Sequence, residues 1–260
     1  MKILYILFFI SSFLSAKTYE GTYKISYGIF GELGEAKTTL TIDNDIYTID
    51  ILAKATGFAK FLSNGKVERY FSKGKIINNE FYSNEFITKK FNNTKEKTKL
   101  YTFDYDKKTI YLNSISKKLQ TTYSNNFEES NSKWITSKSN SENSFFTTND
   151  ILSLFFNVTK SVKTLDRNIK YEYKTLGAKA ENGKINFHFP NVKEKNSLDS
   201  FFKNKNDKLI VTLNQPIFSS KNGELMISVN NDGFCNKAIL KDVLMFGDIT
   251  GELVDFITRN

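Results

Sequence analysis

Several residue types that build reactive sites are almost missing from this chain. It has one cysteine, one histidine, one tryptophan and two prolines among 260 residues. A lone cysteine cannot form an intrachain disulfide, so we expect Cys235 to be buried and inert. One histidine and one cysteine are too few ligands for a multi-histidine metal site or a structural zinc site. We therefore expect neither a metal nor a cofactor.

The single histidine also limits nucleophilic catalysis. A Ser-His-Asp or Cys-His arrangement would have to use His188, which lies on the polar side of an alternating run. A surface imidazole is the favoured interpretation. Asp43, Asp45 and Asp50 lack the glycine and closing glutamate of a calcium-binding loop, so an ordinary turn is favoured there.

Arginine is scarce, since only Arg69, Arg167 and Arg259 stand among 37 basic residues. Arginine is the usual reader of bases and clamp of phosphates, so nucleic acid is not the expected partner. The formal charge of +9 leaves two interpretations open. A lysine-rich surface attracts anionic lipids or glycans. A compositional bias is the other interpretation, and it is favoured because the lysines are spread along the chain.

The first 16 residues have the pattern of a secretory signal peptide. Lys2 supplies the charged start, residues 3–14 are mostly apolar, and Ala16 is a small residue at the cleavage position. We expect cleavage after Ala16 and a periplasmic mature chain of residues 17–260. The apolar run is shorter than the roughly 20 residues of a membrane span, so an uncleaved anchor is the less favoured alternative.

Alternation of apolar and polar residues predicts a mostly β fold. Such alternation, typical of strands with one buried face, occurs at 19–27, 38–42, 47–53, 101–105, 169–173, 185–189 and 225–229. Asn-Gly pairs at 64–65, 182–183 and 222–223 predict hairpin turns. Hairpins in series predict an antiparallel meander curled into an open or incomplete barrel, which protects its edges. One curled sheet and two packed sheets both fit this pattern.

Two stretches depart from the alternation. Residues 121–148 are polar and predict a long loop, an insertion or a ragged strand pair within a single domain of residues 17–260. Residues 150–162 carry apolar side chains at helical spacing, and Thr148 or Asn149 is expected to cap the helix. We expect this short helix to pack on the concave side of the sheet.

The order of short motifs resembles the exported bacterial proteins grouped as domain of unknown function 3108. The motifs are Tyr23-Lys-Ile-Ser-Tyr27, the glycines Gly28, Gly31 and Gly34 with Ala36, Ala55-Thr-Gly-Phe58, Val67-Glu-Arg-Tyr-Phe-Ser72, Asp150-Ile-Leu-Ser-Leu-Phe155, Asn231-Asp-Gly233 and Leu244-Met-Phe-Gly-Asp-Ile249. The resemblance covers nearly the whole mature chain. It implies a periplasmic, β-rich protein without an assigned activity, and it supplies no functional residues.

Aromatic residues suggest where a ligand would bind. The candidate binding residues are Phe58, Lys60, Phe61, Tyr70 and Phe155. A sheet lined with Phe and Tyr could hold an acyl chain, with lysine at the rim for a phosphate or carboxylate. An ordinary aromatic core is the competing interpretation.

The favoured function is non-enzymatic binding of an amphipathic envelope molecule, such as a lipid or an acyl chain, by a monomer. A structural or assembly partner of an envelope protein complex is the alternative. A hydrolase using paired carboxylates, such as Asp248 with Glu252 or Glu128 with Glu129, is the least favoured, because no motif supports it.

Overall fold

The described part of the chain comes from a computed structural model. It covers residues 16–123, 130–161, 166, 169–178, 181–202, 207–212, 224–241 and 247–260. Apart from Ala16, the expected signal peptide lies outside these residues. Within them, no helix is both long enough and apolar enough to cross a membrane.

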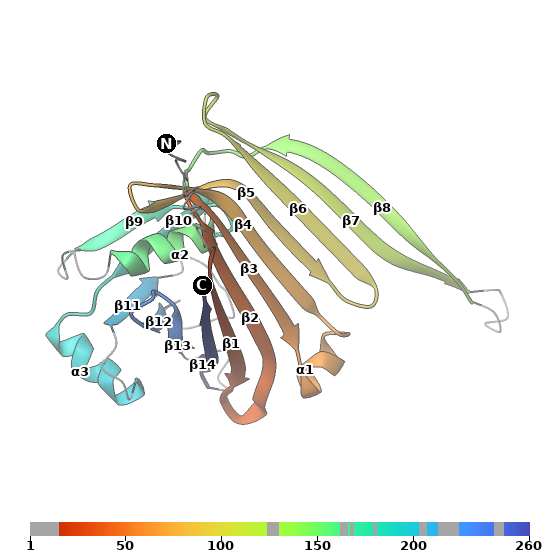
Figure 1. Cartoon of the computed structure of the whole chain (residues 1–260). Helices are drawn as coiled ribbons and strands as arrows, with labels where there is room; N and C mark the ends of the chain where they lie inside the picture. Colours follow the sequence, from red (N-terminus) through yellow and green to blue (C-terminus); the bar gives the residue numbers. More distant parts are fainter. Residues whose placement is uncertain are drawn as a thin grey trace, which may run out of the picture.

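Fourteen strands of the described chain form one antiparallel sheet in the order β8-β7-β6-β5-β4-β3-β2-β1-β14-β13-β12-β11-β10-β9 (Figure 1). The strands are β1 (Lys17–Tyr27), β2 (Gly31–Asp43), β3 (Ile46–Ala55), β4 (Val67–Ile77), β5 (Glu80–Phe91), β6 (Lys95–Asp104), β7 (Thr109–Tyr123), β8 (Ser130–Glu142), β9 (Lys170–Lys174), β10 (Lys184–His188), β11 (Asp207–Thr212), β12 (Glu224–Val229), β13 (Cys235–Leu240) and β14 (Ile249–Arg259). The prediction of a mostly β, antiparallel fold is confirmed, and the strands make one sheet instead of two.

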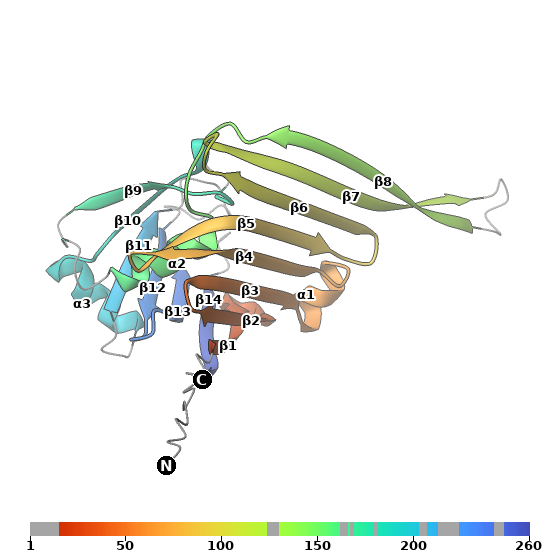
Figure 2. The same cartoon turned by 45° about the horizontal axis from the view of Figure 1, so that its top comes forward.

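The sheet curls around helix α2 (Ile151–Lys160) without closing into a barrel (Figures 1 and 2). Leu176, which follows β9, shares a buried cluster with Phe86, Phe103 and Ile110 of β5, β6 and β7. Distant parts of the sheet therefore meet near the start of α2. We call the face of the sheet toward α2 the inner face and the opposite one the outer face.

Helix α2 packs against both halves of the curled sheet. Leu154 and Val158 belong to a buried cluster with side chains of β10, β11 and β12. Phe156 belongs to another cluster, with side chains of β2 and β3. Burying each such side chain contributes on the order of 1.5–3 kcal/mol. The helix predicted near 150–162 is thus confirmed, and it ties the two halves together.

Asp150, and not the expected Thr148 or Asn149, caps this helix. Its side chain accepts hydrogen bonds from the backbone N–H groups of Leu152 and Ser153, while the Ser153 side chain returns a bond to the backbone of Asp150. The expected caps were wrong because a carboxylate directly before the first helical residue reaches the free N–H groups of the first turn.

The Asp150 carboxylate also joins the helix to the sheet. It is fully buried, and its Oδ2 accepts hydrogen bonds of 2.5 Å each from Ser72 Oγ on β4 and Ser83 Oγ on β5. Both serine hydroxyls lie within 3.2 Å of the Tyr47 hydroxyl. Burial raises the pKa of Asp150, and the hydrogen bonds oppose that effect. A buried carboxylate is tolerated when its acceptors are satisfied in this way.

Positive φ angles mark the tight turns. Asn182 and Gly183 have φ values of 56° and 66° in the connection between β9 and β10. Asn64 and Gly65 have φ values of 56° and 73°, but they follow a helix, so the link from β3 to β4 is longer than a two-residue hairpin. The pair at 222–223 lies outside the described residues. Asparagines 78 and 79, with φ values of 51° and 66°, join β4 to β5.

Two helices were not predicted from the sequence. Helix α1 (Gly57–Leu62) stands between β3 and β4, and none of its residues is buried. Helix α3 (Val192–Phe201) begins with a capping box formed by Asn191 and Glu194. The short 3-10 turns η1 (Gly28–Phe30) and η2 (Glu181–Gly183) complete the elements.

The polar stretch 121–148 continues the sheet through much of its length. Strand β8 pairs with β7 in register from Tyr111 opposite Glu142 to Tyr123 opposite Ser130. Of the alternatives left open for this stretch, a strand pair is therefore observed, and residues 124–129 lie outside the described part. The added strands β7 and β8 make the inner face wider than the region that α2 covers (Figure 1).

Replacing Asp150 by alanine tests its role as cap and anchor. We expect the free energy of unfolding of the mature protein to fall by about 3 kcal/mol, from a lost cap and from buried hydroxyls left unsatisfied. Urea denaturation followed by circular dichroism measures it. Alanine at exposed Asp106 is the control, expected to cost less than about 0.5 kcal/mol. Equal costs for the two variants would contradict the anchoring role.

Candidate functional site

An apolar cavity of about 350 Å³ lies between α2 and the inner face of the sheet. It is lined by Tyr23, Ile25, Ala36, Thr38 and Ile51 on β1 to β3, by Ile151, Leu152, Phe155 and Phe156 on α2, and by Phe234, Cys235 and Gly251. Small side chains help to leave this space open. At Gly251, an added Cβ would meet no other atom within 4 Å. We call this space the first cavity.

A second cavity of about 200 Å³ adjoins the first, on the other side of Phe155. Strands β10, β11 and β12 form its wall with Ile185, Phe187, Leu209, Val211, Leu225 and Ile227. Ile151 and Phe155 line both cavities. These two residues are four positions apart and therefore lie on one side of the helix. Phe155 thus separates two neighbouring apolar spaces.

The helix leaves this side incompletely packed. Leu154, Phe156 and Val158 are buried, whereas Ile151 and Phe155 keep part of their surface accessible. Protein interiors are normally packed without voids larger than a water molecule. Phe155 packs against the two buried clusters that α2 joins, and the two cavities lie beside it.

Cys235 stands in the wall of the first cavity and is partly buried, not fully buried as expected. Burial raises the pKa of its thiol to about 12, with a small opposing effect from the backbone of Lys237. Burial also raises the pKa of the nearby Tyr23 hydroxyl. Both groups therefore stay neutral at physiological pH, which suits an apolar occupant.

A larger hollow of about 780 Å³ opens on the same sheet over β4 to β8. Its lining includes Lys66, Lys90, Lys95, Lys97, Lys117 and Lys118, together with Asn92, Ser116 and Ser137. One carboxylate, Glu96, also lines it and pairs with Lys117. We call it the basic hollow. Its lysines come from four different segments, so only the folded sheet brings them together.

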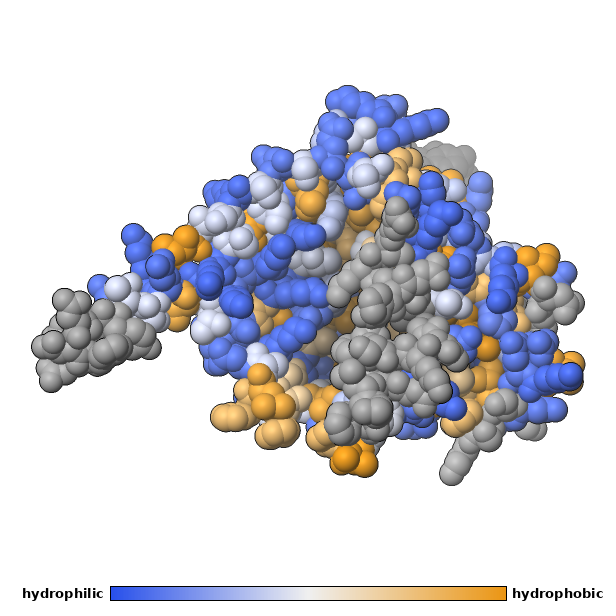
Figure 3. Space-filling model, turned by 180° about the vertical axis from the view of Figure 1, so that it is seen from behind, coloured by the Kyte–Doolittle hydropathy of each residue, from blue (hydrophilic) through white to orange (hydrophobic). Residues whose placement is uncertain are grey.

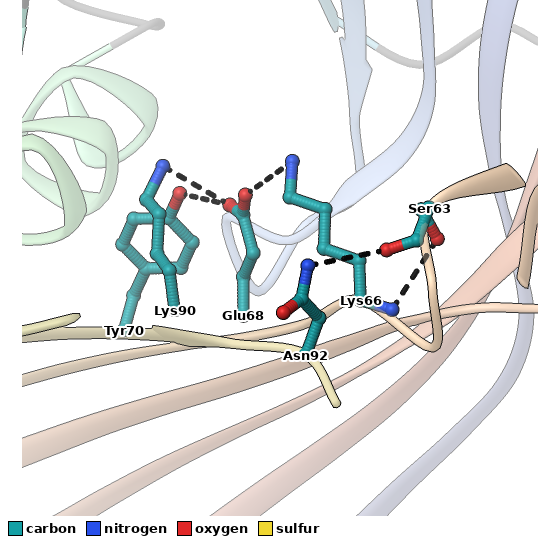
Figure 4. Close-up of polar contacts among 6 residues, drawn as sticks. All are labelled: Ser63, Lys66, Glu68, Tyr70, Lys90 and Asn92. Atoms are coloured by element: carbon teal, nitrogen blue, oxygen red, sulfur yellow. Dashed lines mark hydrogen bonds and ion pairs between the residues drawn. The ribbon is translucent and has the colours of Figure 1, made fainter. Parts of the chain in front are cut away.

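Glu68 organises the side of the basic hollow nearest to the first cavity (Figure 4). Its carboxylate lies 2.8 Å from Lys66 Nζ and 3.3 Å from Lys90 Nζ, and it accepts a hydrogen bond from the Tyr70 hydroxyl. Partial burial alone would raise the pKa of Glu68, but these three partners bring it below its usual value. Glu68 is therefore ionised at neutral pH and holds both lysines in place.

The five candidate residues of the sequence analysis do not form one site. Phe155 lines both cavities, and Tyr70 contacts Glu68 at the edge of the basic hollow. Phe58, Lys60 and Phe61 lie on α1, where the two phenylalanines are 63% and 80% exposed. The structure therefore places Phe155 in the cavities, Tyr70 at the basic hollow and the three α1 residues on the exposed surface.

The chain matched no protein-family model, no curated protein and no solved structure. The site therefore rests on its geometry alone.

Sequence reasoning missed the lysines of the basic hollow and the anchor Asp150. Lys90, Lys97 and Lys118 lie far apart in the chain, and only the strand register shows that they share a face. An Asp directly before a run of apolar residues at helical spacing was a usable indication of the cap.

The other polar candidates are engaged elsewhere. His188 is mostly covered, not on the open surface as expected, because helix α3 brings Glu194 Oε1 to 3.3 Å from its Nε2. Asp50 is bound by Arg69 through two hydrogen bonds of 2.9 and 2.5 Å. Among the residues that the structure describes, no group of three or more His, Cys, Asp or Glu could hold a metal ion.

The Cys235 thiol should react slowly with Ellman's reagent. Raising the pKa from 9.0 to about 12 cuts the thiolate fraction at about pH 8, and the greater nucleophilicity of a high-pKa thiolate offsets only part of this. We expect a rate at least about thirtyfold below that of the urea-unfolded protein, rising as pH increases. Equal rates for folded and unfolded protein would show that the thiol is not buried in the cavity wall.

Proposed function

We propose that the mature protein is an exported periplasmic protein that binds an acyl chain of an amphipathic envelope molecule without transforming it. The observation that carries this proposal is the pair of apolar cavities on either side of Phe155. The first cavity, at about 350 Å³, reaches the range of roughly 300–1,000 Å³ usual for small-molecule sites.

The proposed location is supported by the amino-terminal segment and by the resemblance to domain of unknown function 3108. A charged start, an apolar run and Ala16 support export and cleavage. The resemblance adds membership of that exported family to the proposal. Neither assigns a reaction, and the carboxylate-based hydrolase remains the least supported function.

Titration with palmitate by isothermal calorimetry tests binding. We expect wild-type protein to bind palmitate and Phe155→Asp to weaken the affinity at least about tenfold, because a carboxylate in an apolar cavity is poorly solvated. Phe58→Asp makes the same chemical change on exposed α1 and should leave the affinity unchanged. Circular dichroism of all three proteins establishes that they are folded.

Equal affinities for the two Asp variants would place the palmitate site outside the cavities, and no binding by wild type would refute the proposal. Native mass spectrometry of protein purified from its own periplasm then identifies a natural occupant. A bound lipid absent from Phe155→Asp supports the proposal.

A second candidate function, assembly with another envelope protein, rests on exposed apolar side chains at one end of the molecule. Ile29 is 82% exposed, Phe61 80% and Leu62 68%. They belong to η1 and α1, which lie close together because Thr56 N donates to Leu33 O. Figure 3 shows the hydrophobic surface gathered at this lower end. Exposed apolar patches of this kind are typical of interaction sites.

Photo-cross-linking distinguishes this second candidate. A photoreactive amino acid at position 61 should cross-link to one defined envelope protein in intact cells, since Phe61 projects from the exposed helix. The same label at position 138 on β8 should give no such product. Identical products from both positions would rule out assembly through this end of the molecule.

A further inference from the structure

One row of side chains connects the first cavity with the basic hollow. Residues paired across strands share a face, and the register runs Tyr23–Ala36–Ala53–Glu68–Lys90–Lys97–Ser116–Ser137 from β1 to β8. The row begins in the first cavity and ends in the basic hollow. With strands about 4.8 Å apart, Ala36 and Lys97 are separated by about 19 Å.

Charges on β5 to β8 are sorted between the two faces. By strand alternation from Phe86 and Phe103, which pack near α2, the inner face carries Lys90, Lys95, Lys97, Lys99, Lys118 and Lys133. The acidic residues of these strands, Glu80, Glu85, Glu96, Asp104 and Glu142, fall on the outer face. A bias in composition accounts for many lysines but not for this separation.

Two carboxylates lie at the basic hollow, Glu96 paired with Lys117 and Glu68 paired with Lys66 and Lys90, and they do not offset all of its lysines. Glu68 is the one inner-face carboxylate in the described part of β4 to β8, and it contacts both Lys66 and Lys90. Lys95, Lys97 and Lys118 have no ion pair among the contacts described for the chain. Several ammonium groups beside the hydroxyls of Ser116 and Ser137 suit a multiply charged oxyanion.

We propose that the basic hollow binds the phosphate-bearing head group of the same amphiphile whose acyl chain occupies the first cavity. This inference rests on the proposed function and names its ligand class. The acyl chain of the ligand lies against the small apolar side chains of β1 to β3. Its head group lies beyond Glu68, against Lys97 and Lys118. Lysine ammonium groups act there as point charges for phosphate oxygens.

Three probes separate the contributions of chain and phosphate: palmitoyl lysophosphatidic acid, monopalmitoylglycerol and glycerol 3-phosphate. We expect lysophosphatidic acid to bind at least about tenfold more tightly than monopalmitoylglycerol at low salt, with the difference shrinking as salt is added. Glycerol 3-phosphate, which lacks the chain, should bind at least about a hundredfold more weakly than lysophosphatidic acid.

Charge-neutralising variants then test the lysines. Lys97→Gln with Lys118→Gln should weaken lysophosphatidic acid binding about tenfold and change monopalmitoylglycerol binding less than about twofold. The control, Lys37→Gln with Lys138→Gln, removes the same net charge from the outer face and should change neither affinity.

Each contrary result has a distinct meaning. Equal binding of the two palmitoyl compounds, or equal losses in the two double variants, overturns the head-group site while leaving acyl binding intact. Glycerol 3-phosphate binding as tightly as lysophosphatidic acid shows a free phosphate site and also overturns the lipid assignment. Binding of no palmitoyl compound overturns the proposed function itself.

Discussion

The Asp150 carboxylate is the contact on which the arrangement of this protein depends. It caps α2 and at the same time accepts hydrogen bonds from Ser72 and Ser83 on two adjacent strands. Apolar packing alone would favour sliding the helix into the space beside Phe155. A buried, fully bonded polar network gives one defined position to an element whose packing is incomplete, since displacement would leave its charge unsatisfied. The cavities can persist because the helix is held from one end.

With distance from Asp150, the side chains of the inner face change from large apolar to small apolar to cationic. Large apolar side chains fill the region under the start of α2. Small side chains such as Ala36 line the first cavity. Lysines follow on the strands beyond Glu68. Each step falls on the same face because side chains alternate along every strand and the register keeps neighbours aligned. A surface that is apolar at one side and cationic at the other matches the two ends of an anionic amphiphile.

Local patterns in the sequence were enough to predict a mostly β antiparallel meander, about half of its strands, and α2, because side chains repeat every two residues along a strand and every 3.6 along a helix. They were not enough for α1, a short helix with no buried face, or for α3. Phe58 and Phe61 looked like cavity residues from their composition, yet α1 presents them to solvent. The lysine face was beyond sequence reasoning, since it depends on which residue of β5 lies opposite Lys97 of β6. Pairing across strands is a tertiary property.

The incomplete closure of the sheet has a further consequence at its margins. Strands β8 and β9 end the hydrogen-bonding order of the described chain, so each offers backbone groups along one side. Such margins can recruit a strand from another molecule and seed fibres. On β8, Lys133 and Lys138 and a run of serines and asparagines place charge and polarity there, and Lys170 and Lys174 do the same on the short β9. The hydrophilic stretch that interrupts the apolar alternation thus gives an open sheet a margin that resists aggregation.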